Sequence, residues 1–449
     1  MAVIAPFRAV RYNPAKIHAI EEVVTPPYDV IDAQVQAALL TKNPYNMIRL
    51  DLSKNVKSGE MISERYAGAA ELFGRWQAEG VLLREERPAF YLYEIDYRRP
   101  GGQTLTRRGF LSRVRLAEFS EGIVKPHEKT FAGVTSDRLK LLEACQAQFS
   151  PIFSLYSDPR GEVVNRLAQG RPDAPLYRVT DSDGCQHRLW AVTDPAVLAV
   201  VGDYFRDKAL YIADGHHRYT TALHYRALAR EREGRVEPES PANHTMMYLC
   251  GMEDPGLSVL STHRLLRLPG AKTGADLLAV LAESFEVEEI TTGSRESLLI
   301  ETFSRMVEGQ EQGKNTRFGM YHPGEDRCFL LTLKNGVMDR EAGHQPPALR
   351  ELDVVVLSDL IIDRLPDLDK SRCVQGDLID YYSDADEALD VAIKEARQGS
   401  ELTPVLFLMN ATRVDQVRRV ADENLVMPHK STFFYPKILT GLAINPLAE

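Results

Sequence analysis

The chain has 449 residues, of which 44% are hydrophobic and 26% are charged, and its formal net charge at pH 7 is -10. A chain of this length and balance is expected to form two or three globular domains or one large α/β body. The negative charge argues against a nucleic-acid or anionic-membrane partner, because both attract a basic surface. The sequence has no apolar run of membrane-spanning length, and its first residues do not have the pattern of a signal peptide.

The spacing and number of the cysteines indicate the cellular compartment of the protein. They are far apart, odd in number and without a C-x-x-C pair, which is typical of reduced thiols rather than of a disulfide framework. We therefore expect a cytoplasmic protein. The five positions are Cys145, Cys185, Cys250, Cys328 and Cys373.

Up to residue 204, the residue patterns predict helices that alternate with β-hairpins. Amphipathic periodicity marks the helices, and runs of aromatic and β-branched residues mark the strands. The hairpins turn at Pro100-Gly101-Gly102 and between Asp181 and Gly184. The predicted helices are 59–80, 136–148 (opened by Ser136 or Asp137) and 194–204, and the predicted hairpin strands are 89–98 with 104–114 and 176–181 with 186–192.

Beyond residue 244, strands and helices continue to mix. The predicted strands are 246–252, 257–266 and 403–409, with a hairpin in 317–334, and the predicted helices lie within 273–310 and at 350–364, 384–398 and 412–424. This mixture predicts an α+β fold (mixed α/β), with mixed sheets, hairpins and peripheral helices. There is no dinucleotide-binding G-x-G-x-x-G after a strand and no Walker motif.

Three regions are expected along the chain. Residues 1–265 are predicted to form a phosphate- or nucleotide-binding core. Residues 266–400 are predicted to be a peripheral region of helices and a hairpin. Residues 401–449 are predicted to be a C-terminal segment that docks back on the core.

The segment 209–226, ALYIADGHHRYTTALHYR, is the most informative stretch. A short apolar strand meets a turn at Asp214-Gly215, and helical periodicity begins at His217. The first turn of a helix has unpaired N–H groups and the positive end of the helix dipole, so it stabilises a phosphate. Gly215 lets the backbone approach closely, and Arg218 has a guanidinium that suits phosphate. The alternative is a turn whose polar residues only cap the helix, but the consecutive Asp, His, His and Arg favour a functional site.

Two upstream segments carry further candidates. In EGIVKPHEKT (121–130), Lys125 and His127 could contact an anionic ligand, and Glu128 could act as a base or metal ligand. The segment lacks the second histidine that a zinc helix needs. In VTPPYDVID (24–32), a stiff Pro-Pro turn could hold Asp29 as a catalytic carboxylate. Both segments have a purely structural alternative, as a solvated loop and as a rigid turn.

The tail segment 427–437, MPHKSTFFYPK, combines basic and hydroxyl side chains with three aromatic residues. We expect the aromatic residues to pack in the fold. Lys430 and Ser431 are the candidates for binding a phosphate or a nucleotide.

Five segments, PPYDVID, NPYNMIRLD, VKPHEKT, ADGHHRY and MPHKSTFFYPK, together resemble the bacterial family labelled domain of unknown function 1015. That family has no established activity, although its members tend to be associated with serine metabolism. The turn ADGHHR is also similar to the phosphate-gripping turn of the ParB/sulfiredoxin superfamily, which includes sulfiredoxin, the CTP-binding ParB domain and free-serine kinases. This second resemblance implies a ParB/sulfiredoxin-like core around 209–226. It also implies phosphate binding by Asp214, Gly215, His216 and Arg218.

The resulting hypothesis is a phosphotransferase that acts on a small hydroxyl substrate, first of all serine or phosphoserine, with a nucleotide or phosphoanhydride donor. The phosphate would be held by the turn, with His216 and His217 beside it, and Mg²⁺ with ATP or ADP is the expected cofactor. Lys125 and Lys430 would neutralise charge. In the kinases, the catalytic carboxylate lies upstream of the turn, and Asp29 and Glu128 are the candidates for it.

Two alternatives remain from the residues. The first is a nucleotide-binding ParB-like switch without turnover, which would bind nucleotide and form a homodimer. The second is a phosphoesterase with His216 or His217 as the nucleophile, which a trapped phosphohistidine would reveal. All three hypotheses require a small-molecule or nucleotide ligand, and none requires a membrane or nucleic acid.

Overall fold

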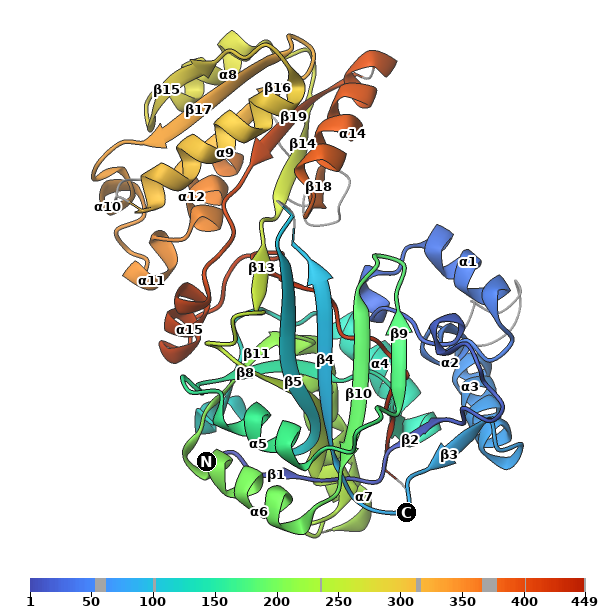
Figure 1. The fold of residues 1–449 in the computed structure, drawn as a ribbon. Coiled ribbons are helices and arrows are strands. Elements are labelled where there is room, and N and C mark those ends of the chain that lie inside the picture. Colours follow the sequence, from blue (N-terminus) through green and yellow to red (C-terminus); the bar gives the residue numbers. More distant parts are fainter. Residues whose placement is uncertain are drawn as a thin grey trace. The chain divides into compact units, whose positions relative to one another are not determined.

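The computed structural model describes residues 1–52, 62–99, 102–234, 236–311, 316–365, 378–399 and 401–447. The chain forms two compact units (Figure 1). Unit 1 consists of Met1–Ser258 and Pro436–Glu449, and unit 2 consists of Val259–Tyr435. Both units combine helices with sheets, so the predicted α+β class is confirmed.

A mixed sheet of nine strands, counted over the described residues, is the centre of unit 1. Most neighbouring strands are antiparallel, but β6 pairs with β11 and β8 pairs with β12 in parallel. The order is β6 (Val124–Lys125), β11 (Leu210–Asp214), β8 (Ile152–Tyr156), β12 (His244–Gly251), β5 (Thr104–Arg115), β4 (Phe90–Arg98), β10 (Gln186–Val192) and β9 (Tyr177–Thr180), and β1 (Ile4–Ala5) also pairs with β5. The predicted hairpin strands are present as β4 with β5 and as β9 with β10. The first hairpin's turn includes residues 100 and 101, which lie outside the described residues.

Helices and short strand pairs complete unit 1. The helices are η1 (Ile20–Glu22), η2 (Tyr28–Val30), α1 (Ala33–Lys42), α2 (Ile48–Asp51), α3 (Ile62–Ala78), η3 (Phe119–Glu121), α4 (Ala132–Cys145), α5 (Glu162–Gly170), α6 (Pro195–Tyr204), η4 (Phe205–Asp207), α7 (His216–Glu233) and η5 (Pro241–Asn243). The short pairs are β2 (Val10–Tyr12) with β3 (Leu82–Arg84) and β7 (Ala147–Gln148) with β21 (Asn445–Pro446). The last of these pairs brings the end of the chain back to unit 1.

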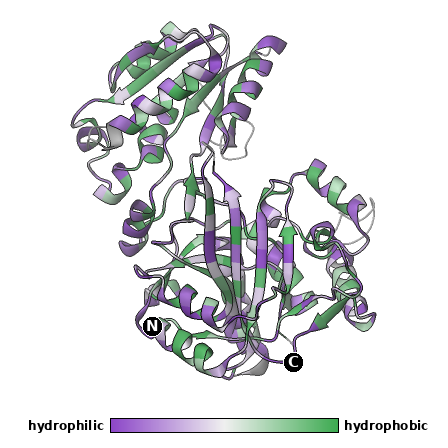
Figure 2. Ribbon diagram, in the orientation of Figure 1, coloured by the Kyte–Doolittle hydropathy of each residue, from purple (hydrophilic) through white to green (hydrophobic). Residues whose placement is uncertain are grey.

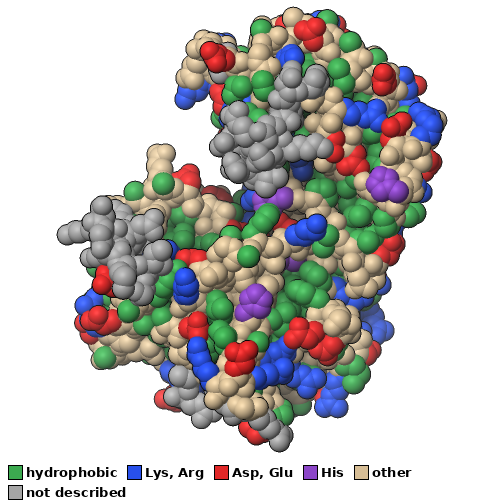
Figure 3. All heavy atoms as spheres, turned by 180° about the vertical axis from the view of Figure 1, so that it is seen from behind, with side chains coloured by type: hydrophobic (Ala, Val, Ile, Leu, Met, Phe, Trp, Pro, Cys, Tyr) green, Lys and Arg blue, Asp and Glu red, His purple; other side chains and the backbone are tan. Residues whose placement is uncertain are grey.

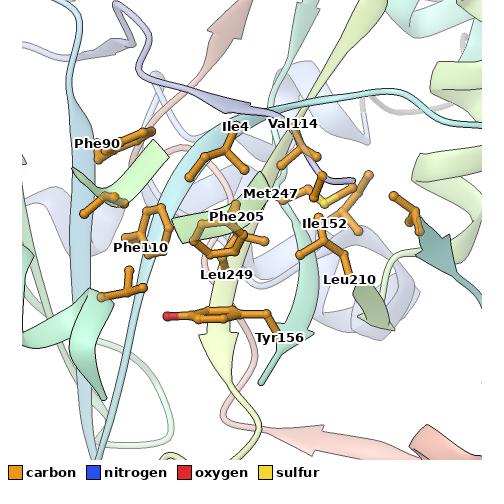
Figure 4. Close-up of a cluster of buried hydrophobic side chains, with 14 of the residues drawn as sticks. Ile4, Phe90, Phe110, Val114, Ile152, Tyr156, Phe205, Leu210, Met247 and Leu249 are labelled. Atoms are coloured by element: carbon orange, nitrogen blue, oxygen red, sulfur yellow. The ribbon is translucent and has the colours of Figure 1, made fainter. Parts of the chain in front are cut away.

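One face of the sheet carries the main hydrophobic core of unit 1. Side chains alternate between the two faces of a strand, so Phe110, Ile152 and Leu249 of three strands point into one cluster (Figure 4). Phe205 of η4 packs against Phe110 with ring centroids 5.9 Å apart. Apolar residues of α5, α6 and α7 close this cluster, and these helices carry hydrophilic residues as well (Figure 2). The other face of the sheet is the one that positions the site.

Unit 2 is built around a six-stranded antiparallel sheet among its described residues. Its order is β15 (Phe285–Ile290), β17 (Arg327–Leu333), β16 (Arg317–His322), β19 (Leu402–Leu408), β14 (His263–Pro269) and β18 (Ile379–Tyr382). The helices are α8 (Gly274–Leu281), α9 (Arg295–Glu311), α10 (Val337–Glu341), α11 (Pro347–Arg350), α12 (Asp353–Leu360), η6 (Ile362–Arg364), α14 (Ala385–Gln398) and α15 (Val414–Asp422). Apolar residues of α9 and α14 pack on the sheet in one core cluster. A separate pair is formed by β13 (Ser258–Leu260) and β20 (Phe433–Tyr435).

Three predicted elements differ from the structure. The helix expected from Ser136 or Asp137 begins at Ala132 and ends at Cys145, before the short strand β7. The helix expected at 350–364 is divided, because Leu352 takes an extended backbone with φ -83° and ψ 129°. The strand expected at 257–266 is divided into β13 and β14.

The predicted three-region division of the chain stays a prediction. The compact units divide the chain differently, since residues 401–435 belong to unit 2 and only the last residues, from Pro436 on, belong to unit 1. The cysteines that the structure describes, Cys145, Cys185, Cys250 and Cys328, are buried free thiols, and Cys373 lies outside the described residues. None of the described helices has the length and apolar character of a membrane-spanning helix.

Candidate functional site

The end of β11 carries a β-bulge that sets the direction of Asp214. In the pairing with β8, Ile212 lies opposite Ser154 and Asp214 lies opposite Phe153, so Ala213 is the extra residue. A bulge re-aims the side chain that follows it. Asp214 is thereby turned away from the core side of the sheet, to which Ile212 belongs.

Gly215 joins β11 to α7 and has a backbone that favours glycine. Its φ of 92° lies in the left-handed region. A Cβ at this position would lie 2.8 Å from Nε of Arg218. Both the conformation and the close approach therefore require glycine. The helix begins at His216, one residue earlier than the periodicity predicted.

The carboxylate of Asp214 is held between two cations. Its Oδ2 accepts a hydrogen bond from Nη2 of Arg218 at 2.7 Å, and its Oδ1 accepts one from Nζ of Lys437 at 3.1 Å. Burial alone would raise the pKa of Asp214, but the charges of Lys437 and Arg218 lower it far below its usual value. Asp214 therefore stays ionised, and the two cations together outnumber it.

Arg218 also ties the turn to the segment before β8. Its Nη1 donates to Oγ of Ser150 at 2.8 Å and to the carbonyl oxygen of Pro151. Burial would lower the pKa of Arg218, but nearby carboxylates, with Asp214 first, raise it. The guanidinium is thus permanently charged and fixed in position beside Gly215.

His216 connects the turn to the segment 125–131. The backbone N–H of His127 donates to Nε2 of His216 at 3.2 Å, and Nδ1 of His216 lies 3.6 Å from Oε2 of Glu128. Because Nε2 accepts, the proton of the neutral ring belongs on Nδ1, on the side of Glu128. Burial is the main reason that the pKa of His216 is lowered. His216 is therefore a neutral ring whose Nδ1 faces Glu128.

The other residues of this segment surround the first turn of α7. The ring of His127 is buried and lies at 90° to that of His216, with centroids 4.6 Å apart. Burial, and then His216, lower the pKa of His127 to about 3. Nδ1 of His217 accepts the backbone N–H of Phe131 at 3.4 Å, and the two rings stack. Lys125, on the neighbouring strand β6, has its Nζ 5.5 Å from the centroid of the Tyr211 ring.

Asp29 lies in η2 and is exposed. Its charge is among those that raise the pKa of Arg218, together with Asp214 and the neighbouring Tyr28. The Pro-Pro turn thus brings Asp29 into the electrostatic surroundings of the site, although no hydrogen bond joins Asp29 to Arg218 in the described structure.

Lys430 and Ser431 lie in unit 2. The backbone carbonyl of Lys430 accepts a bond from Arg264 at 3.3 Å, and Oγ of Ser431 donates to the carbonyl oxygen of Pro428 at 2.6 Å. These contacts stabilise a turn in which Lys430 has a φ of 58°. Their predicted phosphate-binding role stays a prediction.

The structure adds residues that the sequence prediction did not place in the site. Lys437 stands at the end of the same tail segment, but its ion pair with Asp214 spans 223 residues of sequence. Asp51 and Arg138 form a buried ion pair at 3.0 Å near Arg218. Asp51 is the last residue of the segment NPYNMIRLD. The polar residues of that segment were the only feature of the sequence that pointed to Asp51.

The described residues contain no group of three or more His, Cys, Asp or Glu side chains that could hold a metal ion. Both carboxylate oxygens of Asp214 already face cations. A Mg²⁺ ion at this site would therefore depend on the phosphates of a bound nucleotide.

Comparisons with known proteins give one family match. The model of the family described as protein of unknown function (DUF1015) matches residues 4–355. No curated protein matches the chain.

Several solved structures are similar to the chain at low identity. A free serine kinase in complex with AMP is 14% identical with a TM-score of 0.33, over 73% of this chain and 90% of that chain. A conserved hypothetical protein from Pyrococcus furiosus is 14% identical with a TM-score of 0.33, over 73% and 94%. SbnI with a C-terminal truncation, from Staphylococcus aureus, is 13% identical with a TM-score of 0.34, over 75% and 88%.

Proposed function

Because the chain belongs to the DUF1015 family, whose name states no activity, we propose from the site itself that it is a phosphotransferase. It transfers a phosphoryl group between a nucleotide, or another phosphoanhydride, and a small hydroxyl compound, with serine and phosphoserine as the first substrates to test. The observation that carries the proposal is the convergence of Arg218, Lys437 and Glu128 on the first turn of α7.

The turn supplies what a phosphate needs. The first-turn N–H groups of α7 have no carbonyl of their own helix to bind, and the helix dipole is positive there. Two cations, Arg218 and Lys437, lie next to the carboxylate of Asp214 and offset its charge. Gly215 leaves room beside the backbone for the guanidinium of Arg218, whose Nε would lie 2.8 Å from a Cβ at this position. Phosphoryl transfer depends mainly on positioning and charge neutralisation, and this arrangement provides both.

Glu128 is the carboxylate best placed to receive the proton of the attacking hydroxyl. The hydroxyl oxygen forms a bond to phosphorus, its proton passes to Glu128, and the bond from phosphorus to the leaving phosphate oxygen breaks with its electron pair. Nδ1 of His216 faces this carboxylate, with 3.6 Å between Nδ1 and Oε2. Asp29 remains the second candidate, because its charge reaches Arg218. Mg²⁺, held by the nucleotide phosphates, would supply further charge neutralisation when it is bound.

The geometry argues against a phosphohistidine at His216. One of its ring nitrogens accepts the N–H of His127, and the other faces Glu128. A histidine nucleophile needs one nitrogen with a lone pair that is directed at the substrate. A phosphoesterase through His216 is therefore disfavoured. A phosphoesterase through His217 and a nucleotide switch without turnover are the alternatives that the experiment must separate from the phosphotransferase.

Phosphorus NMR tests the proposal. Purified protein with Mg²⁺ is incubated with ATP, ADP or CTP in parallel, together with L-serine, and in the reverse direction with phosphoserine. We expect a phosphomonoester signal to appear, or to be lost, and Glu128→Gln to slow this at least a hundredfold. Glu79→Gln is the control, since Glu79 is exposed at the end of α3. Broadened nucleotide signals without turnover would support the switch, and unchanged spectra with every nucleotide would reject a nucleotide site.

A further inference from the structure

A small cavity lies beside the turn within unit 1. Its volume is about 60 Å³, which is room for a few water-sized groups but not for a nucleotide. Arg218 lines this cavity as well as the turn. Its other polar walls include Tyr28, Asp51 and Arg138, and much of the rest is apolar, with Leu141, Phe149 and Ile152.

Asp51 is the unusual group in this cavity. Arg138 donates from Nη1 to Oδ1 of Asp51 at 3.0 Å and to its backbone carbonyl at 2.9 Å. Oδ2 of Asp51 is buried and has no hydrogen-bond partner among the described residues, and only 5% of Asp51 is exposed. Burial raises the pKa of Asp51 despite the charge of Arg138. A buried carboxylate oxygen without a donor is costly, so it requires an explanation.

Arg138 does not fully neutralise Asp51, because it is shared. Nε and Nη2 of Arg138 both donate to Oδ2 of Asp137, at 2.8 Å and 2.6 Å. Its guanidinium also lies over the ring of Tyr28, 4.5 Å from the centroid. Asp51 therefore contributes to the cavity wall a carboxylate whose Oδ2 has no hydrogen-bond donor among the described residues, and its two neighbouring cations, Arg138 and Arg218, are shared with Asp137 and Asp214.

We propose that this cavity is the acceptor subsite of the phosphotransferase, and that Oδ2 of Asp51 binds a protonated amino group of the acceptor. The inference rests on the proposed function, since Arg218 joins the cavity to the turn. A protonated amine supplies a hydrogen bond and a positive charge together, and a neutral hydroxyl supplies only the first. Asp51 is thus a specificity residue that selects hydroxyl compounds with an amine.

The test compares two ligands that differ only in the amino group. L-Serine and 3-hydroxypropionate are titrated by calorimetry into the wild-type protein and into Asp51→Asn, with and without ADP. We expect the wild type to bind L-serine at least tenfold more tightly than 3-hydroxypropionate, and Asp51→Asn to abolish this preference. Asp173→Asn is the matched control, since Asp173 is exposed on a loop of unit 1.

The outcomes separate the two proposals. Equal binding of both ligands by the wild type, or an unchanged preference in folded Asp51→Asn, overturns the amine subsite even if ADP binds. If L-serine is preferred but no nucleotide binds, the nucleotide donor is rejected and the amine site stands. N-acetyl-L-serine, which lacks the positive charge, tests the wild type without any variant, and binding as tight as that of L-serine would overturn the subsite.

Discussion

The ion pairs around the turn of unit 1 differ in exposure from those on the sheet of unit 2. In unit 1, the ion pairs around the turn are largely withdrawn from water: the side chains of Arg138 and Asp51 are 6% and 7% exposed. In unit 2, the pair of Arg327 with Glu289 is 40% and 39% exposed, and on the face shown in Figure 3 basic and acidic side chains are interspersed. Burying an ion pair costs dehydration that its attraction often fails to recover, whereas an exposed pair costs little. Charges buried together are thus a better guide to a site than the number of ion pairs.

The largest effect is expected from breaking the buried pair in unit 1. Arg138→Met leaves Asp51 buried without its cation and removes a partner of Asp137. We expect the free energy of unfolding to fall by about 3–5 kcal/mol. Urea denaturation followed by circular dichroism measures this, and a loss below 1 kcal/mol would show that Asp51 and Arg138 are not coupled as the structure indicates.

The turn itself can be tested with two glycines. Gly215→Ala places a side chain at a φ of 92° and within 2.8 Å of Nε of Arg218. Gly184→Ala has a φ of 79° but no atom within 4 Å of the new Cβ. We expect both to lose about 1–3 kcal/mol of stability, and only Gly215→Ala to lose nucleotide affinity, because only it displaces Arg218. Equal nucleotide affinities would remove Arg218 from the site.

The buried histidines of unit 1 predict a pH dependence of stability. The pKa of His127 is lowered to about 3 and that of His216 is also lowered, in both cases mainly by burial. Below pH 6.5 the unfolded chain protonates these rings while the folded protein keeps them neutral, so the unfolded state binds more protons and stability falls as the pH falls. Each ring contributes up to about 1.4 kcal/mol per pH unit.

Denaturation at pH 7 and pH 5.5 measures this slope. His127→Gln should reduce it, and His224→Gln, which changes an exposed histidine of α7, should leave it unchanged. The result that contradicts the account is a slope that His127→Gln does not alter.

The smallest effect is expected in unit 2. Arg327→Ala removes a bidentate but exposed pair with Glu289. We expect only a small loss of stability, and less still at high salt, because an exposed pair is screened by water and ions. Urea denaturation in 0.05 M and 1 M NaCl measures the free energy of unfolding of Arg327→Ala and of Arg138→Met. Similar losses in the two variants would contradict the difference between the buried and the exposed ion pair.

The sequence predicted the part of the site that is local. Asp214, Gly215, His216 and Arg218 lie within one strand–turn–helix, so their spacing and the need for glycine already determine how they meet. Glu128 could be named as a candidate from its segment, but its contact with His216 depends on the parallel pairing of β6 with β11.

The remaining residues depend on tertiary contacts. Asp51 and Arg138 are 87 residues apart, and Lys437 is 223 residues from Asp214. In the tail, Lys430 and Lys437 are equally basic by composition, but the chain passes between the units after Tyr435. No local sequence pattern distinguishes these two lysines. The prediction named Lys430, together with Ser431.

The most direct test of the central claim is calorimetric titration of ADP and ATP into the wild type and into Lys437→Met. Lys437 contacts the site through Asp214, and its loss should weaken nucleotide binding about tenfold to a hundredfold, as expected for a charged hydrogen bond of about 1.5–3 kcal/mol. Lys140→Met, an exposed change on α4, should bind nucleotide like the wild type. If the wild type shows no saturable binding, or if Lys437→Met binds equally well, the turn at Asp214 is not a nucleotide phosphate site.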